Sequence, residues 1–368
     1  MSRDATPAAL TPLSRLRDDI MRFAGPVAPR SVPSAETIGA IAAEDVVAAT
    51  AVPTTAVALI AGHAVASIET VGASPYAPAN PARLVPVAAG APIPDGCDAV
   101  VPADAVTHDF GLASVQQAVA PGENLRRAGE DFAAGTRLVT AGTRIAPHLA
   151  LLADAIGHAT LSIRRPRVAV RHADAPEASR SARLVAAMVE ADAETTIGTV
   201  DAPIGAADLV LLVGNAEIGP EDAALALLDG TGRRLGHGAA LAGLESLAWG
   251  TIADRPALVL PHPPVAIFAA RLTLLEPPLT ALAAAREPPP TETRPLTRKI
   301  VSQVGMSEIA LLARDGSAWR PLATGGLSWS AIAAADAFVE LPPQSEGQAE
   351  GTLLTARALT FPPLRSTP

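Results

Sequence analysis

The sequence predicts a multidomain α/β protein whose central domain holds a mostly parallel sheet. Short strands and helices alternate over residues 166–286, which is the pattern of a parallel sheet with helices on both faces. Glycine and proline recur every few residues over 51–128 among short runs of valine, which is typical of an inserted β-rich module. The Pro-rich segment 287–295 predicts a linker before a C-terminal β-domain, 296–368.

The elements before the central domain form a linking domain, which we assign to residues 8–50 and 129–165. Apolar and charged residues at helical spacing predict a helix within 8–24, and 36–45 is a second, shorter helix candidate. Residues 147–157 predict a helix because proline stands near the start and glycine follows the end.

The central domain alternates more regularly than any other part of the chain. Residues 208–213 (DLVLLV) form a near-continuous apolar run of the kind found in buried strands, and 181–192 is amphipathic at helical spacing. The alternation predicts strands at 167–171, 196–200, 208–213 and 257–260, and helices at 181–192 and 221–229.

Composition excludes several classes of protein. A chain of 368 residues with 49% hydrophobic and 18% charged residues can bury a sizeable core, so it is not intrinsically disordered. The formal net charge of −9 argues against nucleic acid as a partner. The single cysteine, Cys97, excludes an intrachain disulfide framework and a Cys-rich zinc site. No run of 18 apolar residues and no secretory signal is evident, so we expect no membrane span and a cytoplasmic protein.

Generic catalytic motifs are missing from the sequence. There is no GxxxxGK[ST] loop, no HExxH and no GxSxG elbow. His172 and Asp174 stand two apart after a predicted strand and could reach a metal or substrate, although a solvated loop is the simpler interpretation.

Residues 214–222 (GNAEIGPED) lead from a predicted buried strand into a predicted helix. The free N–H groups and positive dipole end of such a helix suit an anion. Glu217, Glu221 and Asp222 bring negative charge there, so helix capping and ligand binding through Mg²⁺ are both open. Residues 121–131 (PGENLRRAGED) place an arginine pair beside a turn, which could hold phosphate or simply be a solvated connector.

Four segments, in this order, resemble the molybdopterin molybdenumtransferase family, which includes the E domain of gephyrin. They are 43–47 (AEDVV), 90–101 (GAPIPDGCDAVV), 122–142 (GENLRRAGEDFAAGTRLVTAG) and 260–265 (LPHPPV). The longest, 122–142, is similar to the family's "G-x-N-I-R-x-x-G-E-D" stretch and is the most specific.

The resemblance implies an elongated N-terminal segment, an inserted β-module, an α/β domain and a C-terminal β-barrel-like domain. It also implies a homodimer whose site inserts molybdate into adenylylated molybdopterin with Mg²⁺ held by carboxylates. Basic residues would attract molybdate and phosphate. A molybdoenzyme or another cofactor-biosynthesis protein is the implied kind of partner.

The chain departs from the family at positions that carry charge. The family's "DGYA" is AGHA at 61–64, its "TGDE" is ADAP at 173–176, and its basic turn "KPGKP" is replaced by AGLES at 242–246. Asp131 survives, and Asp174 matches only after a one-residue shift. Lys299 is the single lysine of the chain. Because the lysines of the basic turn are lost, binding of molybdate is hard to reconcile with this sequence.

Three hypotheses follow. The first is a molybdopterin-binding accessory or scaffold protein with weakened catalysis. The second is an active enzyme with relocated ligands, with Arg126, Arg127 and Arg183 as its basic side chains. The third is an interaction protein that inherited only the fold.

The resemblance assigns site residues by position. The catalytic set is Asp131, Asp174 and Asp222, and the metal set is Asp131, Glu217 and Asp222. The residues expected to bind molybdopterin or adenylyl-molybdopterin are Gly90, Arg126, Arg127, Gly214, Asn215, Gly219, Pro261 and His262.

Overall fold

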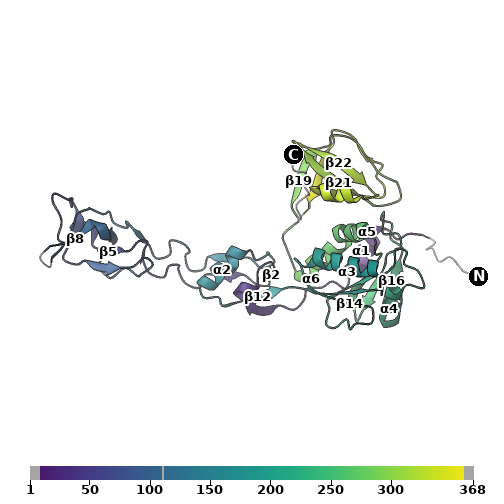
Figure 1. The fold of residues 1–368 in the computed structure, drawn as a ribbon, viewed down its shortest axis with the longest axis horizontal. Helices are drawn as coiled ribbons and strands as arrows, with labels where there is room; N and C mark the ends of the chain where they lie inside the picture. The colour runs from purple at the N-terminus through teal and green to yellow at the C-terminus, as the bar shows by residue number, and fades with distance from the viewer. Residues whose placement is uncertain (1–8, 110–111, 360–368) are drawn as a thin grey trace, which may run out of the picture. The chain divides into compact units, whose positions relative to one another are not determined.

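The computed structural model describes residues 9–109 and 112–359 (Figure 1). The chain divides into two compact units, and each is described by itself. The larger unit comprises Met1–Glu44, Ala141–Pro147 and Thr160–Pro368, and the smaller unit comprises Asp45–Thr140 and His148–Ala159. Contacts therefore group residues 45–50, 129–140 and 148–159 with the inserted module.

The larger unit is built on a six-stranded sheet in the order β14-β13-β15-β18-β17-β16. The first four strands of this order are parallel, and the last two are antiparallel. Their bounds are Arg167–His172 (β13), Glu194–Thr199 (β14), Leu209–Val213 (β15), Gly232–His237 (β16), Ala248–Ile252 (β17) and Arg255–Leu260 (β18). The four strands predicted for the central domain are confirmed to within about two residues at each end.

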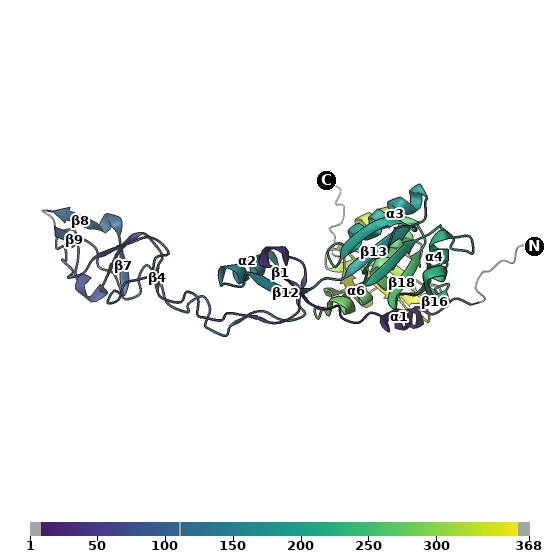
Figure 2. The same cartoon turned by 90° about the horizontal axis from the view of Figure 1, so that it is seen from below.

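Helices cover both faces of this sheet (Figure 2). One apolar cluster packs one face of the sheet against several helices, and a second packs the other face against α4 alone. The helices of the first face are Leu13–Met21 (α1), Pro176–Val189 (α3), Pro264–Ala270 (α5) and Glu276–Ala283 (α6), and α4 is Ala223–Thr231. The alternation of apolar side chains along the buried strands, Leu211 to one face and Leu212 to the other, explains why both faces need cover.

Helices α5 and α6 are joined through a π-helical turn, Arg271–Leu275, into one stretch of 20 residues, Pro264–Ala283. By length and composition this stretch could cross a membrane, but 67% of its most apolar window is buried inside the protein, as in a core helix. Pro277 has no N–H to donate to the Thr273 carbonyl four residues earlier. That carbonyl oxygen instead accepts from Nε of Arg17 at 2.9 Å, which explains how the widened turn is stabilised.

A small three-stranded sheet in the order β1-β12-β2 precedes the central domain within the larger unit. Its strands are Arg30–Pro33 (β1), Ile41–Ala42 (β2) and Thr160–Arg164 (β12). The helix predicted over 36–45 is wrong, because only a 3-10 turn, Ser34–Glu36, forms there. Gly39 has a φ of +80°, which ends any helix, and Ile41 pairs with Arg164 of β12.

The C-terminal domain is a five-stranded antiparallel sheet in the order β19-β25-β23-β21-β22, and Trp319 is buried in its apolar cluster. The prediction of a linker throughout 287–295 is wrong in its second half, because Thr291–Pro295 (β19) pairs with β25. Pro295 is tolerated because β19 is an edge strand. The remaining elements are Ile300–Val301 (β20), Glu308–Asp315 (β21), Ala318–Thr324 (β22), Trp329–Ala334 (α7), Ala337–Leu341 (β23), Gly347–Gln348 (β24) and Leu353–Ala358 (β25).

The smaller unit is β-rich, as predicted. Strand β5 (Gly62–Val65) lies between β6 (Val85–Val87) and β7 (Ala99–Pro102), and Gly62 has no room for a side chain because a Cβ there would be 2.2 Å from the Val101 carbonyl oxygen. The other strands pair in twos: Val46–Val47 (β3) with Arg137–Val139 (β11), Val57–Ala58 (β4) with Leu125–Arg126 (β10), and Val106–Asp109 (β8) with Leu112–Val115 (β9). Two 3-10 turns, Ser67–Thr70 and Ala103–Ala105, lie between the strands, and Pro147–Ala155 (α2) starts at the unit boundary.

Candidate functional site

The strand order of the larger unit creates a topological switch point. Strand β13 lies between β14 and β15, the chain reaches β14 through α3 on one face, and it leaves β15 through α4 on the other. In open α/β sheets, ligands bind in the crevice outside the carboxyl ends of strands at such a point. The candidate site is therefore the edge formed by the loops that follow β13, β15 and β18.

Hydrogen bonds hold these three loops together. Ala173 N donates to Val213 O at 2.9 Å, and Gly214 N donates to Leu260 O at 3.0 Å. The backbone N–H of His262 donates to the Asn215 carbonyl at 3.4 Å. The structure thus brings together Gly214, Asn215 and His262, and the buried Pro261 lies between Leu260 and His262 in the chain.

Asp222 is a helix cap. Its side chain is buried, with the residue 2% exposed, and accepts from the backbone N–H groups of Asn215 at 2.6 Å, Ala224 at 2.9 Å and Leu225 at 3.0 Å. Gly214 is required beside it, because a Cβ there would lie 2.6 Å from both carboxylate oxygens. The turn is completed by Asp222 N, which donates to Gly219 O at 3.0 Å. Of the two interpretations of 214–222, this geometry favours capping.

Glu217 and Asp222, the two predicted metal ligands of the larger unit, form no metal site within its described residues. Within 9–109 and 112–359, no three His, Cys, Asp or Glu side chains lie in an arrangement that could hold a metal ion. Asp174 and Glu217 are exposed, and the oxygens of Asp222 are occupied by backbone N–H groups. The described residues of the larger unit therefore do not fit Mg²⁺ by themselves, and a metal set that also includes Asp131 of the smaller unit stays a prediction.

The starts of α3 and of α5, which follows β18, have no side-chain cap at this edge, and α3 is the longer of the two helices. The residue before the helix is Ala175, whose side chain makes no capping hydrogen bond, and Pro176 occupies the first turn. The N–H groups of the first turn of a helix have no partner inside the helix, so an anion can bind them. An anionic group thus fits the start of α3 better than the start of α4, where Asp222 already supplies the negative charge.

The charges around this edge are mostly acidic. The turn 242–246 lies against the β15 loop, because Ser246 Oγ donates to Ala216 O at 3.3 Å, and its charged residue is Glu245. Glu217 and Asp174 are also exposed. Arg183 is exposed on α3, where it donates to Ser179 Oγ at 3.1 Å.

Asp174 is exposed, as the simpler interpretation of a solvated loop expects, whereas His172 is the last residue of β13 and is buried. His172 is 9% exposed, and its Nδ1 lies 2.9 Å from the carbonyl oxygen of Ala173. Arg171, which the sequence did not single out, is 4% exposed and donates to the carbonyl oxygens of Val170, Thr196, Ala202 and Pro203. Burial lowers the pKa of this guanidinium. The sequence signal that could have pointed to Arg171 is a charged residue at the end of the short predicted strand RVAVR.

The candidate residues of the smaller unit flank strand β4. Arg126 lies on β10, which pairs with β4, and Gly90 N donates to Ala58 O at 2.7 Å. Arg126 Nη1 lies 3.1 Å from Asp131 Oδ2, and both side chains are partly exposed. Arg127 is exposed and its backbone N–H donates to Glu130 Oε2 at 2.7 Å. The turn 121–131 is therefore held by its own acids, as a connector would be.

Comparison with known proteins gives consistent matches along the chain. The family model for the MoeA N-terminal region (domain I and II) matches residues 11–157. Molybdopterin molybdenumtransferase 2 of Mycobacterium tuberculosis is 28% identical over 402 aligned positions, covering 94% of this chain and 98% of that protein. Molybdopterin molybdenumtransferase of Synechococcus elongatus is 30% identical over 38% of this chain and 39% of its own length.

Solved structures show the same fold. A molybdopterin biosynthesis MoeA protein from Pyrococcus horikosii superimposes with a TM-score of 0.71 at 21% identity, covering 95% of this chain and 99% of that one. A molybdenum cofactor biosynthesis protein from Pyrococcus furiosus gives a TM-score of 0.60 at 17% identity over 95% of this chain. The comparisons point the same way: the N-terminal region matches the MoeA family model, a nearly full-length relative is 28% identical, and the fold is similar to that of MoeA proteins.

Proposed function

We propose that this chain binds molybdopterin or adenylyl-molybdopterin and acts in molybdenum cofactor biosynthesis or delivery, with weakened molybdate insertion. The observation that carries the proposal is the contrast at the switch point. The start of α3 has no side-chain cap, so its free N–H groups suit an anion, whereas the exposed side chains around it, Glu177 of the first turn among them, are largely acidic. The proposal includes a cytoplasmic homodimer and a molybdoenzyme or another cofactor-biosynthesis protein as partner.

One phosphate-bearing ligand and one free oxyanion place different demands on this site. The N–H groups at the start of α3 can satisfy a single phosphate of a pterin. Molybdate would bring a second dianion to the same edge, and Glu217 and Glu245 supply repulsion there instead of attraction. Removal of one group that stabilises a developing negative charge typically lowers the rate of an enzyme by about 10²–10³.

The experiment incubates the full chain with adenylylated molybdopterin, Mg²⁺ and molybdate, and follows AMP release alongside pterin binding. We expect micromolar pterin binding and no AMP release at an enzyme-like rate. AMP release at an enzyme-like rate would overturn the weakened-catalysis part. Absence of pterin binding would overturn the proposal as a whole and favour an inherited fold in another pathway.

Two variants locate the binding. Ala175→Asp places a capping carboxylate at the start of α3, so it should stabilise that helix by about 1 kcal/mol while abolishing binding of the phosphate-bearing ligand. Ala226→Asp adds the same charge at an exposed position of α4 and should leave binding unchanged. If the two variants bind the phosphate-bearing ligand equally well, its anionic group does not bind at the start of α3.

A further inference from the structure

The large sheet ends in β14 on one side and in β16 on the other. An edge strand presents unpaired backbone N–H and C=O groups, and proteins usually guard it with proline, charge or a bulge. Strand β16 carries the exposed Arg233 and Arg234 and a register shift beside Arg234. The other described edge strands of the larger unit with four or more residues are guarded as well, apart from β14: β1, β19 and β22 contain Pro33, Pro295 and Pro321.

Strand β14 has none of these guards. Its sequence is ETTIGT, with no proline and no charged residue after Glu194, and it pairs with β13 over all six residues without a register shift. Glu194 N and Val200 N, at the two ends, donate to the neighbouring segment at 2.8 Å and 2.9 Å, so the backbone of the even-numbered residues points inward. Thr195, Ile197 and Thr199 therefore point outward, and their N–H groups have no hydrogen-bond acceptor among the described residues.

Both faces of β14 are covered, so only its edge is open. Helix α3 packs on one face. On the other face the buried Arg171 donates to the Thr196 carbonyl at 3.1 Å and to the Ala202 carbonyl at 3.2 Å. Gly198 leaves room for this crossing, because a Cβ there would lie 2.8 Å from the Ala202 Cβ. The chain after β14 therefore turns across the face of the sheet and not past its edge.

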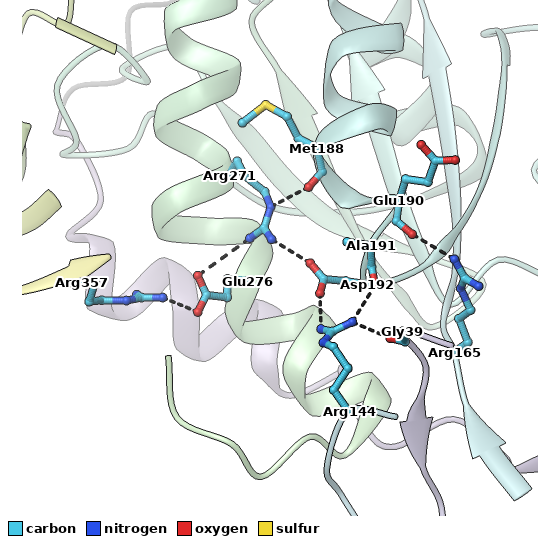
Figure 3. Close-up of polar contacts among 10 residues, drawn as sticks. All are labelled: Gly39, Arg144, Arg165, Met188, Glu190, Ala191, Asp192, Arg271, Glu276 and Arg357. Carbon is cyan, nitrogen blue, oxygen red and sulfur yellow. Dashed lines mark hydrogen bonds and ion pairs between the residues drawn. The ribbon is translucent and has the colours of Figure 1, made fainter. Parts of the chain in front are cut away.

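The turn that leads into β14 is held by three arginines from other elements, Arg144, Arg165 and Arg271 (Figure 3). Arg165 donates to a backbone carbonyl of the turn at 3.0 Å, and the carboxylate of Asp192 accepts from the other two at 2.6 Å and 2.7 Å. Arg271 also lies 3.8 Å from Glu276, which pairs with Arg357 of β25. The strand thus starts from a fixed position, and its unpaired edge is preorganised for pairing.

The open edge is complementary to an antiparallel copy of itself. Unpaired N–H and C=O groups recur at every second residue, a spacing that another extended backbone matches. A two-fold axis at Ile197 places this residue opposite itself and Thr195 opposite Thr199, so each outward-pointing residue meets another one. The register puts Glu194 opposite Val200, so like charges do not face each other, and β-branched side chains form the cross-strand pairs.

We propose that two copies of this chain pair antiparallel through β14 and join their large sheets into one continuous sheet. Ile197 exchanges both backbone hydrogen bonds with the same residue of the other copy, and Thr199 N–H donates to the Thr195 carbonyl of the other copy. So short a strand pair buries less than the about 1,200–2,000 Å² of a stable interface, so the contact is weak and reversible. The inference does not depend on the ligand proposed above, and the homodimer proposed there can form through another surface.

Disulfide trapping in the full chain tests the register directly. In a Cys97→Ser background, Ile197→Cys places two thiols on residues whose Cα atoms are about 5.5 Å apart in the pair, which is within disulfide reach. Thr195→Cys is the matched control, because its two copies lie about 14 Å apart in this register. With oxidised glutathione, Ile197→Cys should form a covalent dimer at least about 10-fold faster than Thr195→Cys. A mixture of Thr195→Cys and Thr199→Cys chains should form the mixed dimer.

Hydrogen exchange gives a second readout that needs no cysteine. The Thr199 amide should exchange at least about 2-fold more slowly at high than at low protein concentration, and Ile197→Lys should remove this dependence. Leu353→Lys makes the same kind of change at another exposed strand residue and should keep it.

Three results would overturn the proposal: no covalent dimer from Ile197→Cys, equally fast trapping of Thr195→Cys, or exchange at Thr199 that is independent of concentration. A dimer that survives Ile197→Lys and is not trapped by Ile197→Cys also overturns it, because that dimer forms through a different surface. Pterin binding is measured separately and should be unchanged in Ile197→Lys, so this inference and the proposed function fail independently.

Discussion

The assignment of Asp222 as a helix cap makes a quantitative prediction about Asp222→Ala. The substitution removes an N-cap worth about 0.5–2 kcal/mol. It also leaves the amides of Ala224 and Leu225, both buried, without an acceptor, and one such unpaired donor costs about 1–3 kcal/mol. Asn215 is exposed, so water can accept from its N–H and that loss adds little. We expect the larger unit to lose about 3 kcal/mol of unfolding free energy.

Hydrogen exchange is the suitable assay because it reports on individual amides of a chain with two compact units. The amides of Ala224 and Leu225 should exchange faster in Asp222→Ala, and thermal unfolding of the larger unit should shift downward. Asp222→Asn keeps one acceptor oxygen but turns an amide group toward the Asn215 N–H, so it should cost about 1 kcal/mol. Glu221→Ala, at the exposed neighbour, should change stability by less than about 0.5 kcal/mol.

Two results would refute the reasoning. One is an Asp222→Ala variant as stable as the wild type, with unchanged exchange at Ala224 and Leu225. The other is stabilisation of the wild-type chain by Mg²⁺ that disappears in Asp222→Ala, because that would place the carboxylate on a metal ion, the alternative that the sequence left open.

Three further predictions concern other parts of the chain. Burial, and secondarily the nearby His108, lower the pKa of His63 below its ordinary 6.5. The unfolded smaller unit therefore binds more protons than the folded one, so its stability is full above pH 6.5 and falls as the pH drops. Thermal unfolding between about pH 7.5 and about pH 5 should show this loss of stability, and His63→Gln should make the pH dependence flatter. Arg17→Met removes the donor to Thr273 O and the pair with Glu340, so urea unfolding should show a loss of about 2–3 kcal/mol that Arg17→Lys does not restore. Glu245→Lys reverses the charge of an exposed turn beside the β15 loop, so it should tighten molybdate binding by about 3–10-fold at low salt, measured in a competition assay. An unchanged affinity for molybdate would show that this turn does not face the oxyanion.

The parts of the fold that the sequence predicted are those in which local pattern and tertiary contact agree. The run 208–213 is apolar without interruption because β15 is buried on both faces. The segment 36–45 misled the prediction because the backbone conformation of Gly39 and the pairing of Ile41 with β12 override its local helix preference. Residues 291–295 form a strand despite Pro295, because β19 lies at the edge of its sheet, where a missing N–H is tolerated.

The positions of two candidate residues relative to the strands were predictable, but their contacts were not. The order of strands and helices was enough to place Gly214 and His262 at the carboxyl edge of the sheet. It could not decide between capping and ligand binding at Asp222, because that depends on where three backbone N–H groups point. The ion pairs from Arg144 to Arg357 left no pattern in the sequence, since each member comes from a different element.

The bond from Arg17 to Thr273 has a consequence for the order in which this chain is synthesised and folded. Its partners are 256 residues apart, and the second partner of Arg17, Glu340, is 323 residues away. While the helix around Pro277 emerges from the ribosome, its free carbonyl depends on a helix made long before. The pair with Glu340 cannot form until nearly the whole C-terminal domain has been translated. The Arg17–Glu340 pair is therefore a late contact that fastens the C-terminal domain to α1, a helix whose apolar side chains pack against α6, β17 and β18, which are made earlier.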